Sequence, residues 1–278
     1  RARFFPFSLP SFLGHIMKKI LVSGDSWTAG WPLEETVPRE QFTWPNLVAQ
    51  HFACELVDKS RAGSSNYRIY RKCFEGILDS SVDTVIVFLS SWTRWETGST
   101  IGEKPGKIWQ ENAGGQPRHL TSKVTRRVQT QQHLVKDVDM EFFRNFFNGY
   151  KQITDMYRMI ISLQNLAKQH NTKCYFLDTY IDNVYNKDCI TLAEFGTILQ
   201  YNISEYDNMD DERIKEKYNK VINLYKHIQK ETFISNDSYQ KIIKDCKLEE
   251  NHPVKDGHQK IAQVVIDFLE GENSGKTI

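Results

Sequence analysis

The sequence predicts a three-layer α/β/α sandwich around a mostly parallel sheet of about five strands. Short apolar runs alternate along the chain with segments in which apolar residues recur every three or four positions. The short runs are typical of buried strands, and the wider spacing is typical of amphipathic helices. Parallel strands need a crossover between them, so helices of this kind should cover both faces of the sheet.

Three apolar runs predict strands in the first part of the chain. Ile20 to Val22 ends in a turn signal, Glu55 to Val57 is brief, and Thr84 to Leu89 is continuously apolar. A continuous apolar run is expected for a strand that is covered on both faces. Helix-like spacing predicts helices at about 44–52 and 65–78, between these strands.

The second part of the chain continues the same alternation. Apolar residues step by three or four from Phe142 to about His170, which predicts a long helix. Cys174 to Leu177 predicts a fourth strand, and Thr232 to Ile234 predicts a fifth. A closing helix is expected through Ile261 to Leu269.

One domain accounts for most of the chain, with boundaries expected at residues 17–272. Residues 1–16 contain two prolines within an apolar stretch and no small-residue cleavage site, so we interpret them as an extension outside the fold. Polar, aperiodic inserts are expected at about 97–140 and 181–230, and residues 273–278 form a tail.

Charged residues distinguish the two inserts. The stretch from Lys104 to Arg127 is basic, which is typical of a solvated loop but also suits attraction of an anionic substrate. The second insert has acidic residues from Asp207 to Glu212 ahead of a helix-like stretch from Ile214 to Tyr225. Because carboxylates suit the positive end of a helix, this run predicts a solvated helix start.

Composition excludes several classes of function. The 36 lysines and arginines nearly balance the 35 acidic residues, so bulk nucleic-acid binding is not expected. The five cysteines lack a C-x-x-C spacing, which disfavours a disulfide framework and a zinc cluster and favours a reducing, cytoplasmic location. No apolar run reaches the length of about 18 residues that predicts a membrane span.

The turns after the strands are the places to search for chemistry, because ligands of open α/β sheets bind beyond the carboxyl ends of the strands. The first turn contains Gly24, Asp25 and Ser26, and a serine there presents its hydroxyl to the crevice. Serine needs a base, and His252 is the best candidate because Pro253 holds it on an extended loop. Glu249 lies three residues upstream and can reach back to Nδ1 of that histidine.

These motifs together resemble the SGNH (GDSL-type) hydrolase family. The matching blocks are the turn GDSWTAG from Gly24, the pair Ala62 and Gly63 after the second strand, and E-x-x-HP at Glu249. The resemblance implies a flavodoxin-like α/β/α fold that hydrolyses carboxylic esters, often acetyl groups on carbohydrates or acyl chains on lipids, without metal or organic cofactor. It implies that Ser26 is the nucleophile, that His252 is the general base, and that backbone N–H groups of Ser26 and Gly63 form the oxyanion hole.

Two departures from the family pattern leave alternatives open. Position 249 is glutamate where members usually have aspartate, and Glu250 and Asp256 are possible substitutes as the orienting acid. After the third strand the family's G-x-N-D is replaced by Ser90-Ser91-Trp92-Thr93-Arg94-Trp95-Glu96, so the expected asparagine donor is absent. The Asn66 amide is the preferred replacement, with the Thr93 hydroxyl and the Trp92 indole as alternatives.

The expected substrate is a small-molecule or carbohydrate ester. Asp25, Trp92, Thr93 and Arg94 are the candidate substrate contacts, since an indole face suits stacking against a sugar ring. The sequence does not predict the oligomeric state.

Two other functions remain open at this stage. A catalytically impaired glycan-binding module with the same fold would also explain the missing asparagine. A flavodoxin-like nucleotide binder is less favoured, because no glycine-rich phosphate loop follows the first strand.

Overall fold

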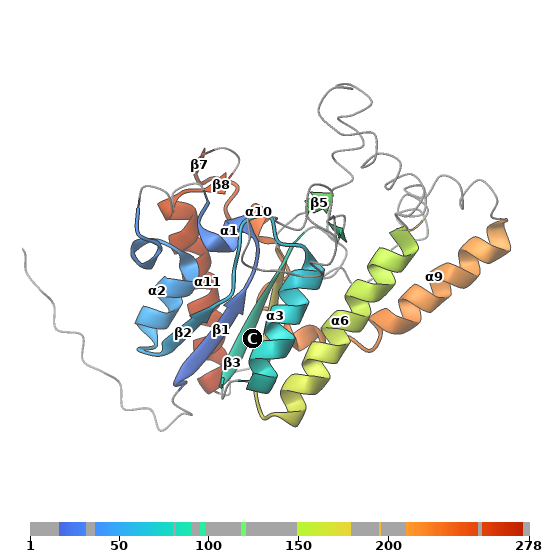
Figure 1. Ribbon diagram of the computed structural model, residues 1–278, viewed down its shortest axis with the longest axis horizontal. Coiled ribbons are helices and arrows are strands. Elements are labelled where there is room, and N and C mark those ends of the chain that lie inside the picture. The colour runs from blue at the N-terminus through green and yellow to red at the C-terminus, as the bar shows by residue number, and fades with distance from the viewer. Residues whose placement is uncertain are drawn as a thin grey trace, which may run out of the picture.

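The computed structural model describes residues 17–31, 37–79, 82–90, 95–97, 118–120, 149–178, 195, 210–249 and 252–274 (Figure 1). The expected extension at 1–16, the end of the tail and most of both predicted inserts lie outside these residues. The single-domain boundaries therefore stay a prediction.

A parallel sheet forms the centre of the molecule. Its strands are β1 (Lys19–Ser23), β2 (Glu55–Asp58), β3 (Thr84–Leu89) and β6 (Lys173–Asp178), in the order β2-β1-β3-β6. Each neighbouring pair is parallel, and Val22 lies in register with Ile86 on one side of β1. The four strands match the first four predicted apolar runs, so the predicted α/β class is confirmed.

Helices follow the strands as the periodicity predicts. The described residues include the α-helices α1 (Ser26–Ala29), α2 (Trp44–His51), α3 (Asn66–Asp79), α6 (Gly149–Gln169), α9 (Asp211–Tyr225), α10 (Tyr239–Ile242) and α11 (Lys255–Ser274). They also include the short 3-10 turns η2 (Arg39–Gln41) and η3 (Lys230–Thr232). The predicted start of the long helix at Phe142 lies outside the described residues. α9 begins at the acidic run, where the Asp210 side chain accepts from the N–H of Arg213, as the solvated helix start predicts.

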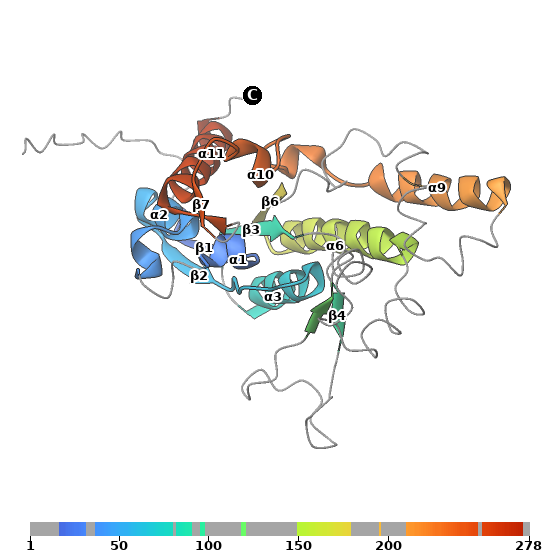
Figure 2. The ribbon, with the colours of Figure 1, turned by 90° about the horizontal axis from the view of Figure 1, so that it is seen from above.

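Strand residues point alternately into two separate cores, which is why helices cover both faces. Leu21, Val85 and Val87 pack with α3, α6 and α9 on one face. Ile20, Val22 and Ile86 pack with α2, α10 and α11 on the other. Seen from above in Figure 2, the sheet lies between these two helical layers, so the three-layer arrangement is confirmed for the described residues.

The predicted fifth strand is wrong. The 3-10 turn η3 takes up Lys230 to Thr232, and only one parallel bridge follows, between Phe233 and Phe176. Ile234 donates its N–H to the carbonyl of Phe176 at 2.9 Å. Because the turn bends the backbone just before this point, a single residue pair reaches the edge of β6.

The sequence did not predict a small hairpin inside the first insert. β4 (Trp95–Thr97) pairs antiparallel with β5 (Arg118–Leu120). No helix in the described part of the chain is long and apolar enough to cross a membrane. Four of the five cysteines are described, and all four are free thiols: Cys54, Cys73, Cys174 and Cys246.

Candidate active site

Two segments from opposite ends of the sequence meet beyond the carboxyl end of β1. Ser26 is the first residue of α1, and His252 begins the short strand β8 (His252–Pro253), which pairs with β7 (Leu248–Glu249). Figure 1 shows α1, β7 and β8 together at this end of the sheet. Nε2 of His252 lies 2.9 Å from Oγ of Ser26, although 226 positions separate them in sequence.

Gly24 makes the sharp turn between β1 and α1 possible. A Cβ atom at this position would lie 2.1 Å from Oγ1 of Thr28 and 2.9 Å from Cβ of Phe88. Real Cβ atoms do not approach other atoms so closely, and both neighbours belong to the buried core. The turn therefore needs glycine, and it places Ser26 directly at the strand end.

Hydrogen bonds within α1 leave one backbone donor for a ligand. The Asp25 carboxylate accepts from the N–H of Trp27 at 3.0 Å. The Asp25 carbonyl accepts from the N–H groups of Thr28 and Ala29 at 3.1 and 2.9 Å. The remaining N–H of the helix belongs to Ser26 and has no acceptor among the described residues. A negative oxygen bound there would also meet the positive end of the helix.

The second predicted donor, Gly63, lies in a turn tied to the first. Its φ of 75° is a left-handed conformation that favours glycine. Arg61, two residues earlier, donates its N–H to the carbonyl of Gly24 at 3.1 Å and accepts from the N–H of Ser64. Within the described residues, the N–H of Gly63 also lacks an acceptor.

The Trp27 ring lies beside the imidazole and is itself packed against Tyr239. The centres of the Trp27 and His252 rings are 6.2 Å apart, and the Tyr239 ring meets Trp27 edge-on at 5.4 Å. Burial raises the pKa of Tyr239 well above its usual value, so its ring is neutral at all ordinary pH values. Gly257 allows α11 to approach the same loop, because a Cβ there would lie 2.8 Å from Cβ of Pro253.

Glu249 lies opposite His252 in the β7–β8 hairpin. Side chains of directly opposed residues in antiparallel strands project to the same side. The Glu249 side chain is exposed, and its carboxylate makes no hydrogen bond to the imidazole among the contacts of the described residues. Of the two predicted substitutes, Asp256 instead accepts from the N–H groups of Lys247 and Gly257, and Glu250 lies outside the described residues.

The side chain of Asp25, a predicted substrate contact, is directed into the protein. Its side chain is completely buried, and its second carboxylate oxygen accepts from the hydroxyl of Ser90 at 2.8 Å. A carboxylate placed at a helix start is held inward by these donors. Asp25 therefore stabilises the turn that carries Ser26.

The side chain of Asn66, the predicted replacement oxyanion donor, bonds to the backbone at the end of β3. Its Nδ2 donates to the carbonyl of Ser90 at 2.8 Å, and its Oδ1 accepts from the N–H of Ser90 at 2.8 Å. Both ends of the amide are thus bonded to the backbone of one residue, so Asn66 is a buried link between α3 and the end of β3. Sequence reasoning missed Ser90, and its only signal was its position directly after the third strand.

The remaining predicted contacts, Trp92, Thr93 and Arg94, lie outside the described residues. No group of three histidine, cysteine or acidic side chains suited to a metal ion occurs in the described parts of the chain.

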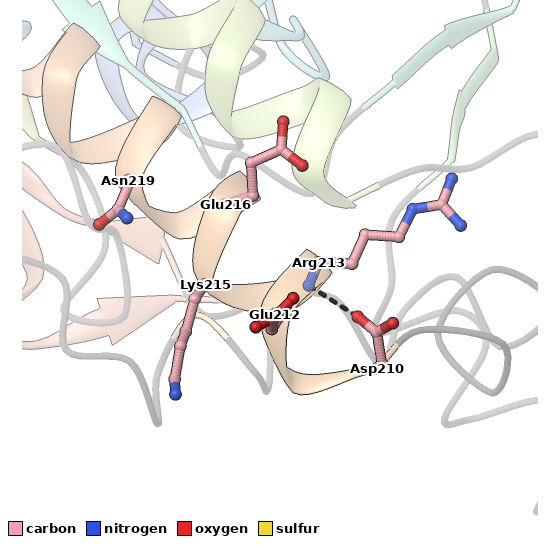
Figure 3. Close-up of a pocket in the computed structure, with 6 residues that line it drawn as sticks. All are labelled: Asp210, Glu212, Arg213, Lys215, Glu216 and Asn219. Atoms are coloured by element: carbon pink, nitrogen blue, oxygen red, sulfur yellow. Dashed lines mark hydrogen bonds between the residues drawn. The ribbon is translucent and has the colours of Figure 1, made fainter.

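A separate hollow on α9 does not belong to this site. Figure 3 shows its charged and polar lining, which comes from α9 and its capping residue: Asp210, Glu212, Arg213, Lys215, Glu216 and Asn219. Asp210 is used to cap the helix by accepting from the N–H of Arg213 at 2.8 Å. Figure 2 places α9 at the opposite side of the molecule from α1 and β7.

Comparison with known proteins gives similarity in structure alone. No protein-family model and no curated protein sequence matches the chain. Similar solved structures include the esterase EstA from Pseudoalteromonas sp., at 11% identity and a TM-score of 0.44, covering 92% of this chain and 98% of that one. A catalytic mutant of the acetylxylan esterase Axe2 from Geobacillus stearothermophilus has 11% identity and a TM-score of 0.45, covering 91% and 94%.

A member of the lipolytic G-D-S-L family from Veillonella parvula is also similar, with 12% identity and a TM-score of 0.42 over 90% of this chain and 97% of that one. Identities and scores of this size transfer neither an activity nor a site residue to this chain. The chain is similar in fold to GDSL-type (SGNH) hydrolases, the family that its sequence motifs resemble.

Proposed function

We propose that this protein is a serine ester hydrolase that acts on small-molecule or carbohydrate carboxylic esters. The observation that supports it best is the distance of 2.9 Å between Oγ of Ser26 and Nε2 of His252. A hydroxyl is a weak nucleophile at neutral pH, and a histidine within hydrogen-bond distance activates it. The placement of Ser26 at the start of α1 adds the second requirement, a backbone donor beside the nucleophile.

The first half of the proposed reaction forms an acyl-enzyme. Oγ of Ser26 attacks the ester carbonyl carbon while Nε2 of His252 takes the hydroxyl proton. The carbonyl oxygen becomes negative, and the N–H groups of Ser26 and Gly63 donate to it. When the tetrahedral intermediate collapses, His252 returns the proton to the leaving alcohol and the acyl group stays on Ser26.

The second half releases the acid. Water attacks the acyl-enzyme, and His252 takes its proton as before. The proton then passes to Oγ of Ser26 as the carboxylic acid leaves, which restores the enzyme. Glu249 is proposed as the acid that orients the imidazole through Nδ1, since it lies directly opposite His252 in the hairpin.

Two substitutions test the proposal directly. We expect purified protein to hydrolyse p-nitrophenyl acetate and to be labelled at Ser26 by a fluorophosphonate. Ser26→Ala and His252→Ala should each lower kcat by at least about a thousandfold, because the nucleophile and its base act as a unit. Labelling at Ser26 would be located by mass spectrometry of the digested protein.

His51→Ala is the matched control for the histidine. His51 is partly exposed on α2 and pairs with Glu270 at 2.9 Å, so its loss should leave kcat within about twofold of wild type. Folded wild-type protein that neither reacts with the fluorophosphonate nor hydrolyses the ester would contradict the proposal. Sugar binding by such inactive protein would favour the glycan-binding alternative.

A further inference from the structure

A buried chain of hydrogen bonds connects the two turns that carry the proposed backbone donors. Asn66 bonds to the backbone N–H and carbonyl of Ser90, and the Ser90 hydroxyl donates to the Asp25 carboxylate. Asp25 in turn accepts from Trp27, the residue next to Ser26. All of these bonds between Asn66, Ser90 and Asp25 are 2.8 Å long.

Because these hydrogen bonds are buried, they strongly restrict the positions of the groups that they join. Asp25 and Ser90 are completely buried, and Asn66 is 3% exposed. Breaking a bond in such a place leaves a polar group without water, which costs more than the bond itself contributes. The carboxylate also makes the contact with Ser90 charge-assisted and therefore stronger than a neutral one.

The need for Asn66 follows from the shape of the sheet. The pairing of β3 with β1 ends at Val87 and its pairing with β6 ends at Leu89, so Ser90 extends past the paired residues on both sides. A buried backbone N–H and carbonyl at such a strand end still need partners. The Asn66 side chain supplies both, in place of a further strand residue.

We propose that Asn66 and Ser90 are positioning residues for Ser26. This inference rests on the proposed hydrolase function. Asn66 begins α3, three residues after Gly63, and Asp25 immediately precedes Ser26. The chain Asn66–Ser90–Asp25 thus fixes the distance between the N–H of Gly63 and that of Ser26, which must both reach one oxyanion.

Two substitutions remove different links of this chain. Asn66→Ala removes both bonds to the backbone of Ser90. Ser90→Ala removes the hydroxyl bond to Asp25 and keeps the two Asn66 bonds, because Asn66 contacts the backbone of Ser90. An error of about 1 Å in the geometry of a site can cost a hundredfold in rate, so we expect each variant to lower kcat about 10- to 100-fold with KM within about twofold.

Gln164 provides a matched control. Its amide likewise bonds to the backbone of one residue, donating to the carbonyl of Gln229 at 3.0 Å and accepting from its N–H at 3.2 Å, and it also donates to the Thr232 hydroxyl at 2.8 Å. It is 4% exposed, but it joins α6 to the loop before η3, outside the chain of bonds that leads to Ser26. Gln164→Ala should lower the urea midpoint as Asn66→Ala does, yet keep kcat within about twofold of wild type.

The experiment measures kcat, KM, the rate of fluorophosphonate labelling and the urea midpoint for wild type and the three variants. Slower turnover and labelling in Asn66→Ala and Ser90→Ala alone would support the inference. Folded variants with wild-type kcat, or an equal loss in Gln164→Ala, would overturn it while leaving the hydrolase proposal intact. An inactive wild type would overturn both.

Discussion

At the scale of single residues, Asp25 determines which backbone N–H group of α1 is left for a ligand. Its carboxylate and carbonyl occupy the other N–H groups of α1, and only the N–H of the serine is left without an acceptor among the described residues. The hydroxyl and the backbone N–H of one residue then lie side by side at the helix start. The proposed reaction needs this arrangement, with the proposed nucleophile and oxyanion donor fixed in advance.

Glu249 gives the first prediction at this scale. If its carboxylate orients His252, Glu249→Gln should lower kcat at least tenfold with little change in KM, because the imidazole loses its preferred tautomer. Asp256→Asn should leave kcat within about twofold of wild type, since the Asp256 carboxylate already accepts from Lys247 and Gly257. Steady-state kinetics with p-nitrophenyl acetate measures both. A larger loss in Asp256→Asn, or in Glu250→Gln, would assign the orienting acid elsewhere.

Sequence reasoning predicted that Ser26 and His252 meet but not the partners of Asp25 and Asn66, and there is a physical reason. A strand followed by a turn fixes where Ser26 lies, and the proline after His252 keeps that residue on a loop. The orientations of the Asp25 and Asn66 side chains depend instead on the backbone and hydroxyl of Ser90, which follows a strand distant in sequence. No local pattern specifies such a partner.

At the scale of elements, close backbone approaches determine where the histidine loop lies. Gly257 lets the first turn of α11 rest against Pro253, and Gly76 lets α3 rest against β1. A Cβ at Gly76 would meet only the end of the flexible Leu21 side chain, at 2.1 Å. The proline ring beside Gly257 has no comparable freedom to move.

These two glycines make a paired prediction. Gly257→Ala should displace the loop at Pro253. His252 directly precedes Pro253 and would move with it, so kcat should fall about tenfold or more. Gly76→Ala should keep kcat within about twofold, since Leu21 can rotate and alanine favours the helix by up to about 1 kcal/mol. Kinetics and urea unfolding would be measured on both variants. Equal kcat values for the two would show that the loop position does not depend on α11.

The strands also show where the pattern of apolar residues is sufficient to predict an element. The strand from Thr84 to Leu89 was predicted with its observed limits, because the five consecutive apolar residues after Thr84 are typical of a strand in the middle of a sheet. The stretch from Thr232 to Ile234 was wrongly predicted as a strand, because three apolar or β-branched residues do not exclude a 3-10 turn. The β4–β5 hairpin was missed since its two strands are short and lie far apart in a polar insert.

At the scale of the whole molecule, α11 and α2 are joined by a buried histidine. Nδ1 of His258 accepts from the N–H of Trp44, the first residue of α2, at 3.3 Å. Burial, with Arg39 nearby, lowers the pKa of His258 to about 3 from its ordinary value of 6.5. The unfolded chain therefore binds a proton at His258 below pH 6.5, whereas the folded chain does not until pH 3.

The stability that neutral His258 contributes is thus complete above pH 6.5 and is lost as the pH falls toward 3. His258→Asn keeps an acceptor near Nδ1 but cannot titrate. Between pH 7 and pH 5 we expect the free energy of unfolding of wild type to fall by about 2 kcal/mol more than that of the variant. Urea unfolding at both pH values measures this difference. Parallel loss in the two proteins would show that other groups cause the acid sensitivity.

The long separation between Ser26 and His252 has a consequence for synthesis in the cell. A nascent chain that has left the ribosome as far as α9 already contains all four strands of the described parallel sheet. It still lacks the imidazole, so its serine has no partner to remove the hydroxyl proton. On the proposed mechanism, reactivity begins only after residue 252 has emerged and docked, late in translation, and we expect interrupted products that stop before it to be inactive.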